Sequence, residues 1–356
     1  MVFLMGTSDG ISKNIALSRH VWAWLGAAFS LTCLWWAFRK IHMTELGEYL
    51  RCAQLLWLLP AFLAQFIAVI ARARRWGILL DAGVSLRTSF WAQGIGYLFT
   101  NLFPLRLGEP ARILACSLSA ALPLPRVAAS VVVERLFDVI ACVAIVGAVA
   151  PFMDIPPPIQ HVALILGGLG LFGLVALWIT TRLYLHLAGR TRTLPSALST
   201  RFPRLYAIVK DLMLGVLPLN RAGVFLRTTA WTLIAWNFSV LTFWLTIRAF
   251  VSDGTWVEAC FLTGALSFAV SVPSSPGFIG IFQLAGQQAL VQPFDGHYTG
   301  ASALAITLAA HLVYFSLTTL LGLTGLFALR LSHTDLLQKL YGERINKKLP
   351  PPKASS

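Results

Sequence analysis

The stretch Asn101-Leu-Phe-Pro104-Leu-Arg106-Leu-Gly108-Glu109-Pro110-Ala-Arg112 places four charged or amide side chains and two prolines inside an otherwise apolar region. Backbone broken by Pro and Gly at membrane depth survives only where it is buried in protein or lines a water-filled cavity. Charged residues within a membrane are functional-site candidates by default. A second broken stretch follows late in the chain, Ser271-Val-Pro273-Ser-Ser-Pro276-Gly277-Phe-Ile-Gly280-Ile-Phe-Gln283. The two stretches predict broken helices beside a functional site.

Composition sets the class of protein. The chain has 356 residues, of which 57% are hydrophobic and 12% charged, and its mean hydropathy is +0.73. Ordinary soluble domains carry about 25% charged residues. The formal charge of +14 comes from Lys and Arg that lie between apolar runs and in the tail, where the positive-inside rule expects them. The sequence therefore predicts a polytopic all-α membrane protein and excludes nucleic acid as a partner.

Neither a disulfide framework nor a metal site is indicated. The cysteines lie mostly in or beside apolar runs without close pairing: Cys33, Cys52, Cys116, Cys142 and Cys260. We expect no cofactor and no metal. Residues 1–20 are mixed in character, and the apolar run 21–38 lacks a small-residue cleavage site, so we expect it to remain as the first helix.

Segment lengths predict about six full crossings and two hairpins. Apolar runs long enough to span about 30 Å of hydrocarbon lie near 21–38, 53–71, 127–150, 159–180, 228–247 and 301–329. Residues 88–103 and 257–272 are shorter, end in the broken stretches, and are each followed by a second short piece, near 111–122 and 278–291. Short, Gly/Pro-interrupted segments at corresponding positions of two halves point to a transporter site. We read both pairs as re-entrant helical hairpins.

Landmarks recur at a nearly constant offset, which predicts an internal repeat. Trp76 and Trp244 differ by 168 positions, as do Gly96 and Gly264; Pro104 and Pro273 differ by 169, as do Gly108 and Gly277. The predicted organisation is a cytoplasmic N-terminal segment 1–20 and a single membrane domain 21–330, followed by a basic tail 331–356. Within the membrane domain, repeat one is about 53–150, repeat two about 228–329, and residues 181–227 form a basic cytoplasmic connector.

The distribution of Lys and Arg predicts the orientation. Basic residues gather after the second and fourth spans and in the tail: Arg72, Arg74, Arg75 and Arg87; Arg182, Arg190, Arg192, Arg201, Arg204, Lys210, Arg221 and Arg227; Arg330, Lys339, Arg344, Lys347, Lys348 and Lys353. The loops 151–158 and 292–300 contain neither Lys nor Arg. The first hairpin would then enter from the cytoplasm and the second from the outside, so that the halves have inverted topology and the C-terminus is cytoplasmic.

A second group of charges lies inside the span 127–150. Glu134 and Asp138 are four residues apart and share one helix face, with Arg135 turned about 100° away. Stranding such charges in the interior costs several kcal/mol each, so they require partners, and the nearest in sequence are Arg106, Glu109 and Arg112. Two interpretations stay open: a closed ion-pair cluster that holds the hairpin, or a cluster that leaves a guanidinium free for an anionic head group.

These residues carry a family resemblance. The patterns Asn101-x-x-Pro104-x-Arg106-x-Gly108-Glu109-x-x-Arg112, Glu134-Arg135-x-x-Asp138 and Pro276-Gly277-x-x-Gly280 resemble those of the flippase-like transmembrane family named after lysylphosphatidylglycerol synthase, the membrane half of the bacterial multiple peptide resistance factor. The resemblance implies a protein of the bacterial plasma membrane that moves a lipid between leaflets. That lipid would be an anionic or aminoacylated phospholipid, or a polyisoprenoid-linked or hopanoid lipid as suggested for other members.

The resemblance has two departures. An acidic residue often follows the second Gly of the late motif in the family, whereas this chain has Gln283. Lipid aminoacylation in the family belongs to a soluble domain, which the short loops and tail of this chain cannot hold. The resemblance therefore implies a separately encoded lipid-modifying enzyme as a partner.

Three functions are compatible with at least part of this pattern. A lipid flippase fits the broken helices together with the charges, and a non-transporting scaffold explains the prolines but not the charges. A membrane-embedded transferase acting on a polyprenyl phosphate or a phospholipid head group would need an acidic pair such as Glu134 and Asp138 for a metal, but Arg135 would compete with a divalent cation. His311, in the last span, reads as a packed, hydrogen-bonded residue rather than a ligand. We expect a transporter and not an enzyme. The residues predicted to bind its substrate lie in the three motifs: Asn101, Arg106, Gly108, Glu109 and Arg112; Glu134, Arg135 and Asp138; Pro276, Gly277, Gly280 and Gln283.

Overall fold

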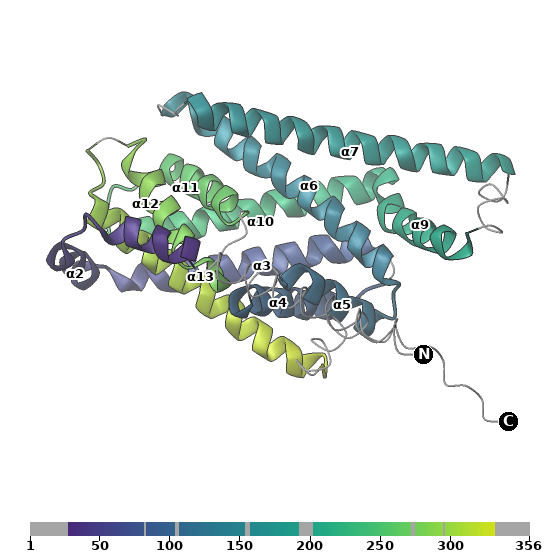
Figure 1. Cartoon of the computed structure of the whole chain (residues 1–356), viewed down its shortest axis with the longest axis horizontal. Helices are drawn as coiled ribbons and strands as arrows, with labels where there is room; N and C mark the ends of the chain where they lie inside the picture. The colour runs from purple at the N-terminus through teal and green to yellow at the C-terminus, as the bar shows by residue number, and fades with distance from the viewer. Residues whose placement is uncertain are drawn as a thin grey trace, which may run out of the picture.

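The computed structural model describes residues 28–81, 83–103, 107–153, 157–191, 202–271, 275–294 and 296–331, and in these residues every regular element is a helix (Figure 1). The long helices are α3 (Leu58–Leu80), α6 (Leu124–Val149), α7 (Pro157–Thr191), α10 (Ala222–Arg248) and α13 (Gly300–Ala328). The shorter ones are α2 (Met43–Cys52), α4 (Leu86–Leu102), α5 (Gly108–Ala120), α9 (Pro203–Val216), α11 (Trp256–Ala269) and α12 (Ile281–Val291), together with a helical segment at Ala28–Phe38. The all-helical class predicted from the sequence is confirmed.

Three helical stretches of the described part are long and apolar enough to cross a membrane: Leu55–Leu80, Ala222–Arg248 and Gly300–Ala328. The 26-residue helix α6 has sufficient length but carries Glu134, Arg135 and Asp138 near its middle. The chain is thus a membrane protein with several apolar helices. The number of full crossings stays a prediction.

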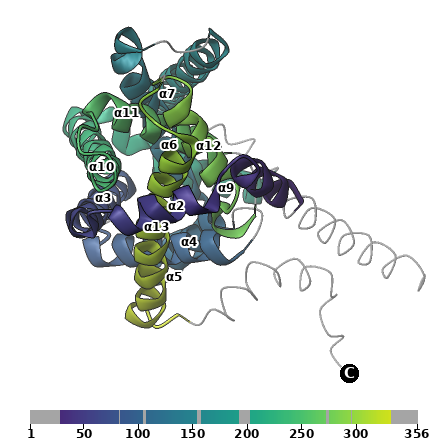
Figure 2. The same ribbon diagram turned by 90° about the vertical axis from the view of Figure 1, so that its left-hand side faces the viewer.

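Helices α3 and α10 form an antiparallel pair that runs the length of the bundle (Figures 1 and 2). At one end the backbone N–H of Gln54 donates to the carbonyl of Ala249 at 2.8 Å. At the other end Arg221 forms an ion pair with Asp81 at 2.6 Å. The two predicted repeats therefore begin with helices of opposite direction.

The described helix α3 corrects the expected position of three arginines. The sequence interpretation ended the second span at residue 71 and assigned Arg72, Arg74 and Arg75 to a cytoplasmic loop. Instead α3 continues to Leu80, so that Arg75 is buried inside the bundle and Arg72 is half-buried, while Arg74 is exposed. These arginines lie within the helix because their partners, described below, lie on the neighbouring helices α6 and α10.

Glycines allow α4 to approach α13 closely. A Cβ at Gly94 would lie 2.8 Å from the carbonyl oxygen of Leu321, and one at Gly322 would lie 2.6 Å from the carbonyl oxygen of Gly94. Small residues of this kind let membrane helices pack backbone against backbone. The hairpin of the first half thus rests on the last helix of the second half, and α11 correspondingly packs on α6.

The two pairs of short helices enter the bundle from opposite ends, because each pair follows one member of the antiparallel pair α3 and α10 (Figure 1). The two pairs approach each other near the end of α4 and at η4, where a Cβ at Gly277 would lie 3.5 Å from the carbonyl oxygen of Asn101. The order of long, short, short and long helices occurs twice, in α3 to α6 and in α10 to α13. Residues 104–106 and 272–274, which include Pro104, Arg106 and Pro273, lie outside the described residues.

The expected connector 181–227 is helical over most of its described length. Helix α7 continues to Thr191, α9 spans Pro203–Val216, and α10 begins at Ala222. Helix α9 packs closely on α6, since a Cβ at Gly215 would lie 2.7 Å from the Cβ of Ala129. Residues 192–201, like the basic tail 332–356 and the segment 1–27, lie outside the described residues.

Candidate functional site

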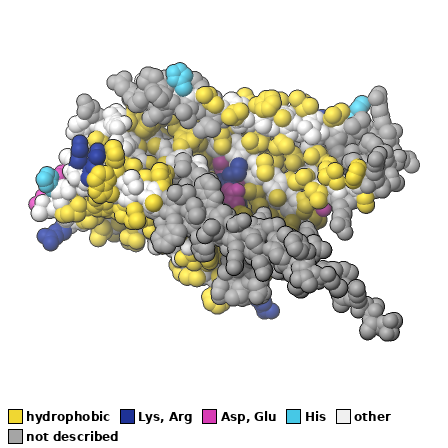
Figure 3. Space-filling model, in the orientation of Figure 1, with side chains coloured by type: hydrophobic (Ala, Val, Ile, Leu, Met, Phe, Trp, Pro, Cys, Tyr) yellow, Lys and Arg dark blue, Asp and Glu magenta, His cyan; other side chains and the backbone are white. Residues whose placement is uncertain are grey.

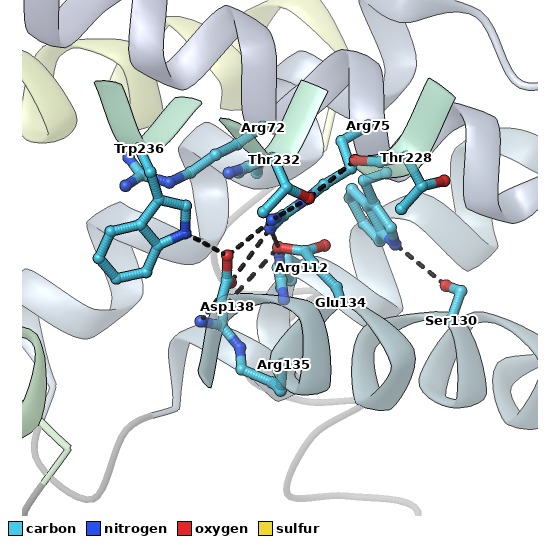
Figure 4. Close-up of polar contacts among 12 residues, drawn as sticks. Arg72, Arg75, Arg112, Ser130, Glu134, Arg135, Asp138, Thr228, Thr232 and Trp236 are labelled. Atoms are coloured by element: carbon cyan, nitrogen blue, oxygen red, sulfur yellow. Dashed lines mark hydrogen bonds and ion pairs between the residues drawn. The ribbon is translucent and has the colours of Figure 1, made fainter. Parts of the chain in front are cut away.

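Arg75 lies at the centre of a buried charge cluster (Figure 4). Its Nη1 and Nη2 contact the two carboxylate oxygens of Asp138 at 2.6 and 3.1 Å, and Nη2 also lies 3.1 Å from Oε1 of Glu134. Nη1 donates to the hydroxyl of Thr232 on α10 at 3.2 Å. Such a two-point contact matches the fork of a guanidinium to a carboxylate. Arg75 therefore joins α3, α6 and α10 in one polar core.

Arg112 extends this core to the first hairpin. Its Nη1 contacts Oε1 of Glu134 at 3.2 Å, and its guanidinium lies 5.1 Å from the ring centroid of Trp76. Arg112 and Glu134 are both buried. On the other carboxylate, the indole N–H of Trp236 donates to Asp138 at 3.2 Å. Each buried carboxylate thus has several donors, as burial of a charge requires.

Arg135 and Glu109 form the exposed side of the cluster. The Nε of Arg135 lies 2.7 Å from Oε1 of Glu109, and its Nη1 lies 3.4 Å from Oδ2 of Asp138. Their side chains are 49% and 45% exposed, whereas Glu134 is 1% exposed. This pair connects the start of α5 to α6 and can exchange partners more readily than the buried core, because water can replace either group.

The sequence predicted two of these partners and missed the central one. Arg112 contacts Glu134 and Glu109 contacts Arg135, as expected from their position in the preceding hairpin. Arg106 lies outside the described residues. Arg75 was assigned to a loop, although the apolar residues that follow it, from Trp76 to Leu80, are the one signal in the sequence that the helix continues.

A cavity of about 320 Å³ adjoins the cluster. All charged side chains of its described lining come from α3, α5 and α6: Arg72, Glu109, Arg112, Glu134, Arg135 and Asp138. The same helices also contribute the uncharged Gln65, Val139 and Cys142. The segment from α11 through η4 (Pro276–Phe278) to α12 contributes no charged side chain to the described lining. Its lining residues are the apolar Leu266, Phe268, Val270, Phe278 and Phe282 and the hydroxyl-bearing Thr263, Ser267 and Ser271. In Figure 3 acidic and basic side chains come to the surface amid a largely hydrophobic face. The cavity is therefore amphipathic.

The charges of the lining and of Arg75 do not balance. Four guanidinium groups, of Arg72, Arg75, Arg112 and Arg135, face three carboxylates, of Glu109, Glu134 and Asp138. Counted over the described residues, the cluster has one positive charge in surplus. Arg112 also keeps its Nε and Nη2 without an acceptor among the described residues. The site can thus accept one negative charge.

The remaining residues of the early motif hold the hairpin. The amide of Asn101 donates to the hydroxyls of Thr318 and Thr319 on α13, each at 2.9 Å, and Asn101 is not a lining residue of the cavity. Gly108 lines the cavity and also packs directly against Gly96, where a Cβ would collide with the Gly96 carbonyl. Both residues thus hold helices together, and substrate binding by them stays a prediction.

The late motif forms a separate polar group around His311. Gly277 and Gly280 have φ values of +65° and +93°, a region that favours glycine, and Pro276 begins the short helix η4. The N–H of Gly280 donates to Oε1 of Gln283 at 2.7 Å, so the amide nitrogen of Gln283 donates to Nδ1 of His311, also at 2.7 Å. The Nε2 of His311 then donates to the carbonyl of Gly277 at 2.8 Å. His311 is a packed, hydrogen-bonded residue, as expected.

Gln283→Leu is expected to destabilise the second hairpin by about 1–3 kcal/mol, because it leaves Nδ1 of the buried His311 and the N–H of Gly280 without partners. Thermal unfolding of the purified protein in detergent measures the effect. Gln292→Leu is the matched control, since Gln292 is exposed and bonds only to Gln288 among the described residues. Equal melting temperatures for the two variants would contradict a stabilising role of the Gln283 hydrogen bonds.

A family model described as the lysylphosphatidylglycerol synthase TM region matches residues 23–322. The chain belongs to this family. The resemblance carried by the early, middle and late motifs is thereby confirmed for nearly the whole membrane domain. As a member of the lysylphosphatidylglycerol synthase transmembrane family, the chain is a membrane protein related to lipid modification or transport. No curated protein and no solved structure matches it.

Within this lysylphosphatidylglycerol synthase membrane domain, the early and middle motifs meet and the late motif stands apart. Glu109, Arg112, Glu134, Arg135 and Asp138 form one cluster. Gln283 contacts only the late motif and His311 among the described residues, and it does not line the cavity. Phe278 and Phe282, which flank these contacts, do line it. The late motif therefore shapes the apolar wall rather than the charged one.

Proposed function

We propose that the protein is a lipid transporter that moves a lipid with an anionic head group between the leaflets of the membrane. The observation that carries the proposal is the amphipathic cavity between two opposed hairpins, with one positive charge in surplus in its charged part. A head group would enter the charged part, and the acyl or prenyl chains would lie along the apolar part or in the surrounding lipid. Sites at the interface of inverted repeats are typical of alternating-access transporters.

The arrangement of the helices supports alternating access. Hairpin one follows α3 and hairpin two follows α10, which runs in the opposite direction, so the two hairpins would reach the middle of the membrane from opposite sides. We propose that the end of the bundle with Asp81 and Arg221 is cytoplasmic and that both hairpins are re-entrant. The C-terminal tail would then be cytoplasmic, in a bacterial plasma membrane.

Transport without covalent chemistry accounts for the charges. Glu134 and Asp138, the acidic pair that a metal-dependent transferase would use, are both engaged by Arg75. An Arg between two carboxylates competes with a divalent cation for the same oxygens. We infer that these residues position the head group and the hairpin and that the protein is not itself an enzyme. A lipid-modifying enzyme encoded separately would supply or consume the lipid.

Reconstituted protein is expected to move a phospholipid labelled on its acyl chain from the inner to the outer leaflet. Bleaching by a membrane-impermeant reductant measures this movement, since protein-free vesicles lose only the outer-leaflet signal. Lys347→Gln/Lys348→Gln is the control that should leave the movement unchanged, because tail charges contribute only surface attraction, about 1 kcal/mol per charge.

The identity of the lipid is followed by mass spectrometry in the same vesicles. Unchanged lipid that has changed leaflet supports transport. If a covalently modified lipid forms when a soluble donor is added, and does not form with Glu134→Gln, the protein is a transferase and not a transporter. If the lipid neither changes leaflet nor is modified, the result contradicts the transporter and favours a non-transporting scaffold.

A further inference from the structure

Arg72 differs from the other arginines of the cluster. Its Nη2 donates to the hydroxyl of Ser239 on α10 at 2.8 Å, and it forms no ion pair within the described residues. Arg75, Arg112 and Arg135 each contact at least one carboxylate. The positive charge that the cluster has in surplus therefore resides on Arg72.

The surroundings of Arg72 suit an anion. Arg72 is half-buried and lines the cavity together with the hydroxyl-bearing side chains of Ser239, Thr242 and Tyr314. It lies beside Trp236, whose indole N–H is directed to Asp138 (Figure 4). A guanidinium has five N–H donors, and the one bond to Ser239 leaves most of them available. Ser239 holds the side chain in place while the rest of the fork faces the cavity.

We propose that Arg72 and Ser239 form the phosphate-binding point of the cavity and that the ligand is a lipid with a singly charged phosphodiester head group. The proposal rests on the proposed function, since it names the group that would recognise the transported lipid. One negative charge neutralises the cluster, and the planar fork of Arg matches two phosphate oxygens. The ion pairs of Arg75, Arg112 and Arg135 are then structural, because the charge of each is already matched by a carboxylate. The N–H groups that Arg112 has left, Nε and Nη2, are buried.

The test measures binding of a short-chain phosphatidylglycerol to the purified full-length protein in detergent by calorimetry. Arg72→Gln is expected to weaken binding about tenfold or more, since a hydrogen bond to a charged group is lost. Arg74→Gln, on the same helix but exposed, is expected to bind like the wild type. Ser239→Ala should weaken binding less than Arg72→Gln, because the charge stays but its position is no longer fixed.

Folding is controlled with a second substitution. Because the side chain of Arg72 has one hydrogen bond and no ion pair within the described residues, Arg72→Gln is expected to melt like the wild type. Arg72→Lys keeps the charge and loses the fork, so its affinity for the lipid is expected to lie between that of the wild type and that of Arg72→Gln. If Arg72→Gln does not fold, the lower affinity of Arg72→Lys relative to the wild type still tests the proposal. Wild-type affinity in Arg72→Lys and Ser239→Ala together would overturn the proposal.

Inorganic phosphate distinguishes a lipid from a free anion. The lipid is expected to bind much more tightly than phosphate, because the apolar part of the cavity contributes. If inorganic phosphate binds as tightly as the lipid, and this binding is lost in Arg72→Gln, the occupant of the site is a free anion and not a lipid.

The flippase assay separates this inference from the proposed function. If the wild type binds the lipid through Arg72 but moves no lipid in vesicles, the transporter function is contradicted and the phosphate-binding point at Arg72 stands. If the wild type transports lipid, and Arg72→Gln binds and moves lipid equally well, the proposed function stands and the assignment of Arg72 as the phosphate-binding point is contradicted.

Discussion

Arg75→Gln is expected to abolish the accumulation of folded protein, and with it any lipid movement. The substitution removes the shared partner of Glu134, which is buried at 1% exposure, and of Asp138, which is partly buried at 15% exposure. Removing one member of a buried pair costs about 3–5 kcal/mol. That is a large share of the roughly 5–15 kcal/mol by which native proteins are stable. The yield of monodisperse protein in detergent and its melting temperature measure the effect.

A double substitution shows whether the loss comes from stranded charge. Arg75→Gln/Asp138→Asn removes a charge of each sign and is expected to recover part of the stability lost in Arg75→Gln. Arg74→Gln, on an exposed position of the same helix, is expected to behave like the wild type. If Arg75→Gln itself yields stable, monodisperse protein, the buried core around Arg75 does not hold the bundle together.

Gly108→Ala is expected to push the two helices of the first hairpin apart and to prevent transport. A Cβ at this position would collide with the hydroxyl of Thr100 and with the carbonyl of Gly96. The carbonyl belongs to the backbone of α4 and cannot rotate away. Overpacking of this kind costs roughly 1–3 kcal/mol, and more where backbone must shift. Melting temperature and lipid movement in vesicles both measure the result.

Gly147→Ala is the matched control on α6. A Cβ there meets nothing within 4 Å, and the position is exposed. Because Ala favours a helix over Gly by about 1 kcal/mol, this variant should be as stable as the wild type or slightly more so. Gly108→Ala with wild-type stability and transport would show that the hairpin tolerates separation and that its close packing is not required.

Helix breakers made the positions of the short helices predictable from the sequence. The short segments expected at 88–103 and 257–272 correspond to α4 at Leu86–Leu102 and α11 at Trp256–Ala269. Proline and glycine act locally, through backbone sterics and a missing N–H, so their effect can be predicted without knowledge of the fold. The repeat offset follows the same landmarks, because α3 and α10 end 168 residues apart, at Leu80 and Arg248.

The ion-pair partners could not be predicted in the same way. Arg75 lies 63 residues from Asp138 in the chain, and its burial depends on carboxylates that come from another helix. Read alone, an arginine at the end of an apolar run fits a cytoplasmic loop equally well. The same holds for Arg72, whose contact with Ser239 spans 167 residues. Contacts between residues far apart in the chain determine which charges are buried. Sequence patterns report mainly on interactions between residues close in the chain, so they do not identify these partners.

The packing of α4 against α13 has a consequence for biosynthesis. Asn101 bonds to Thr318, which lies 217 residues later in the chain. At a synthesis rate of ~5–20 residues per second, roughly 10 to 40 s separate the emergence of these two residues from the ribosome. During that interval the first hairpin has no α13 to pack against, so its exposed glycine face must be sheltered by lipid, by the insertion machinery or by a chaperone. Its final docking is therefore one of the last events of assembly.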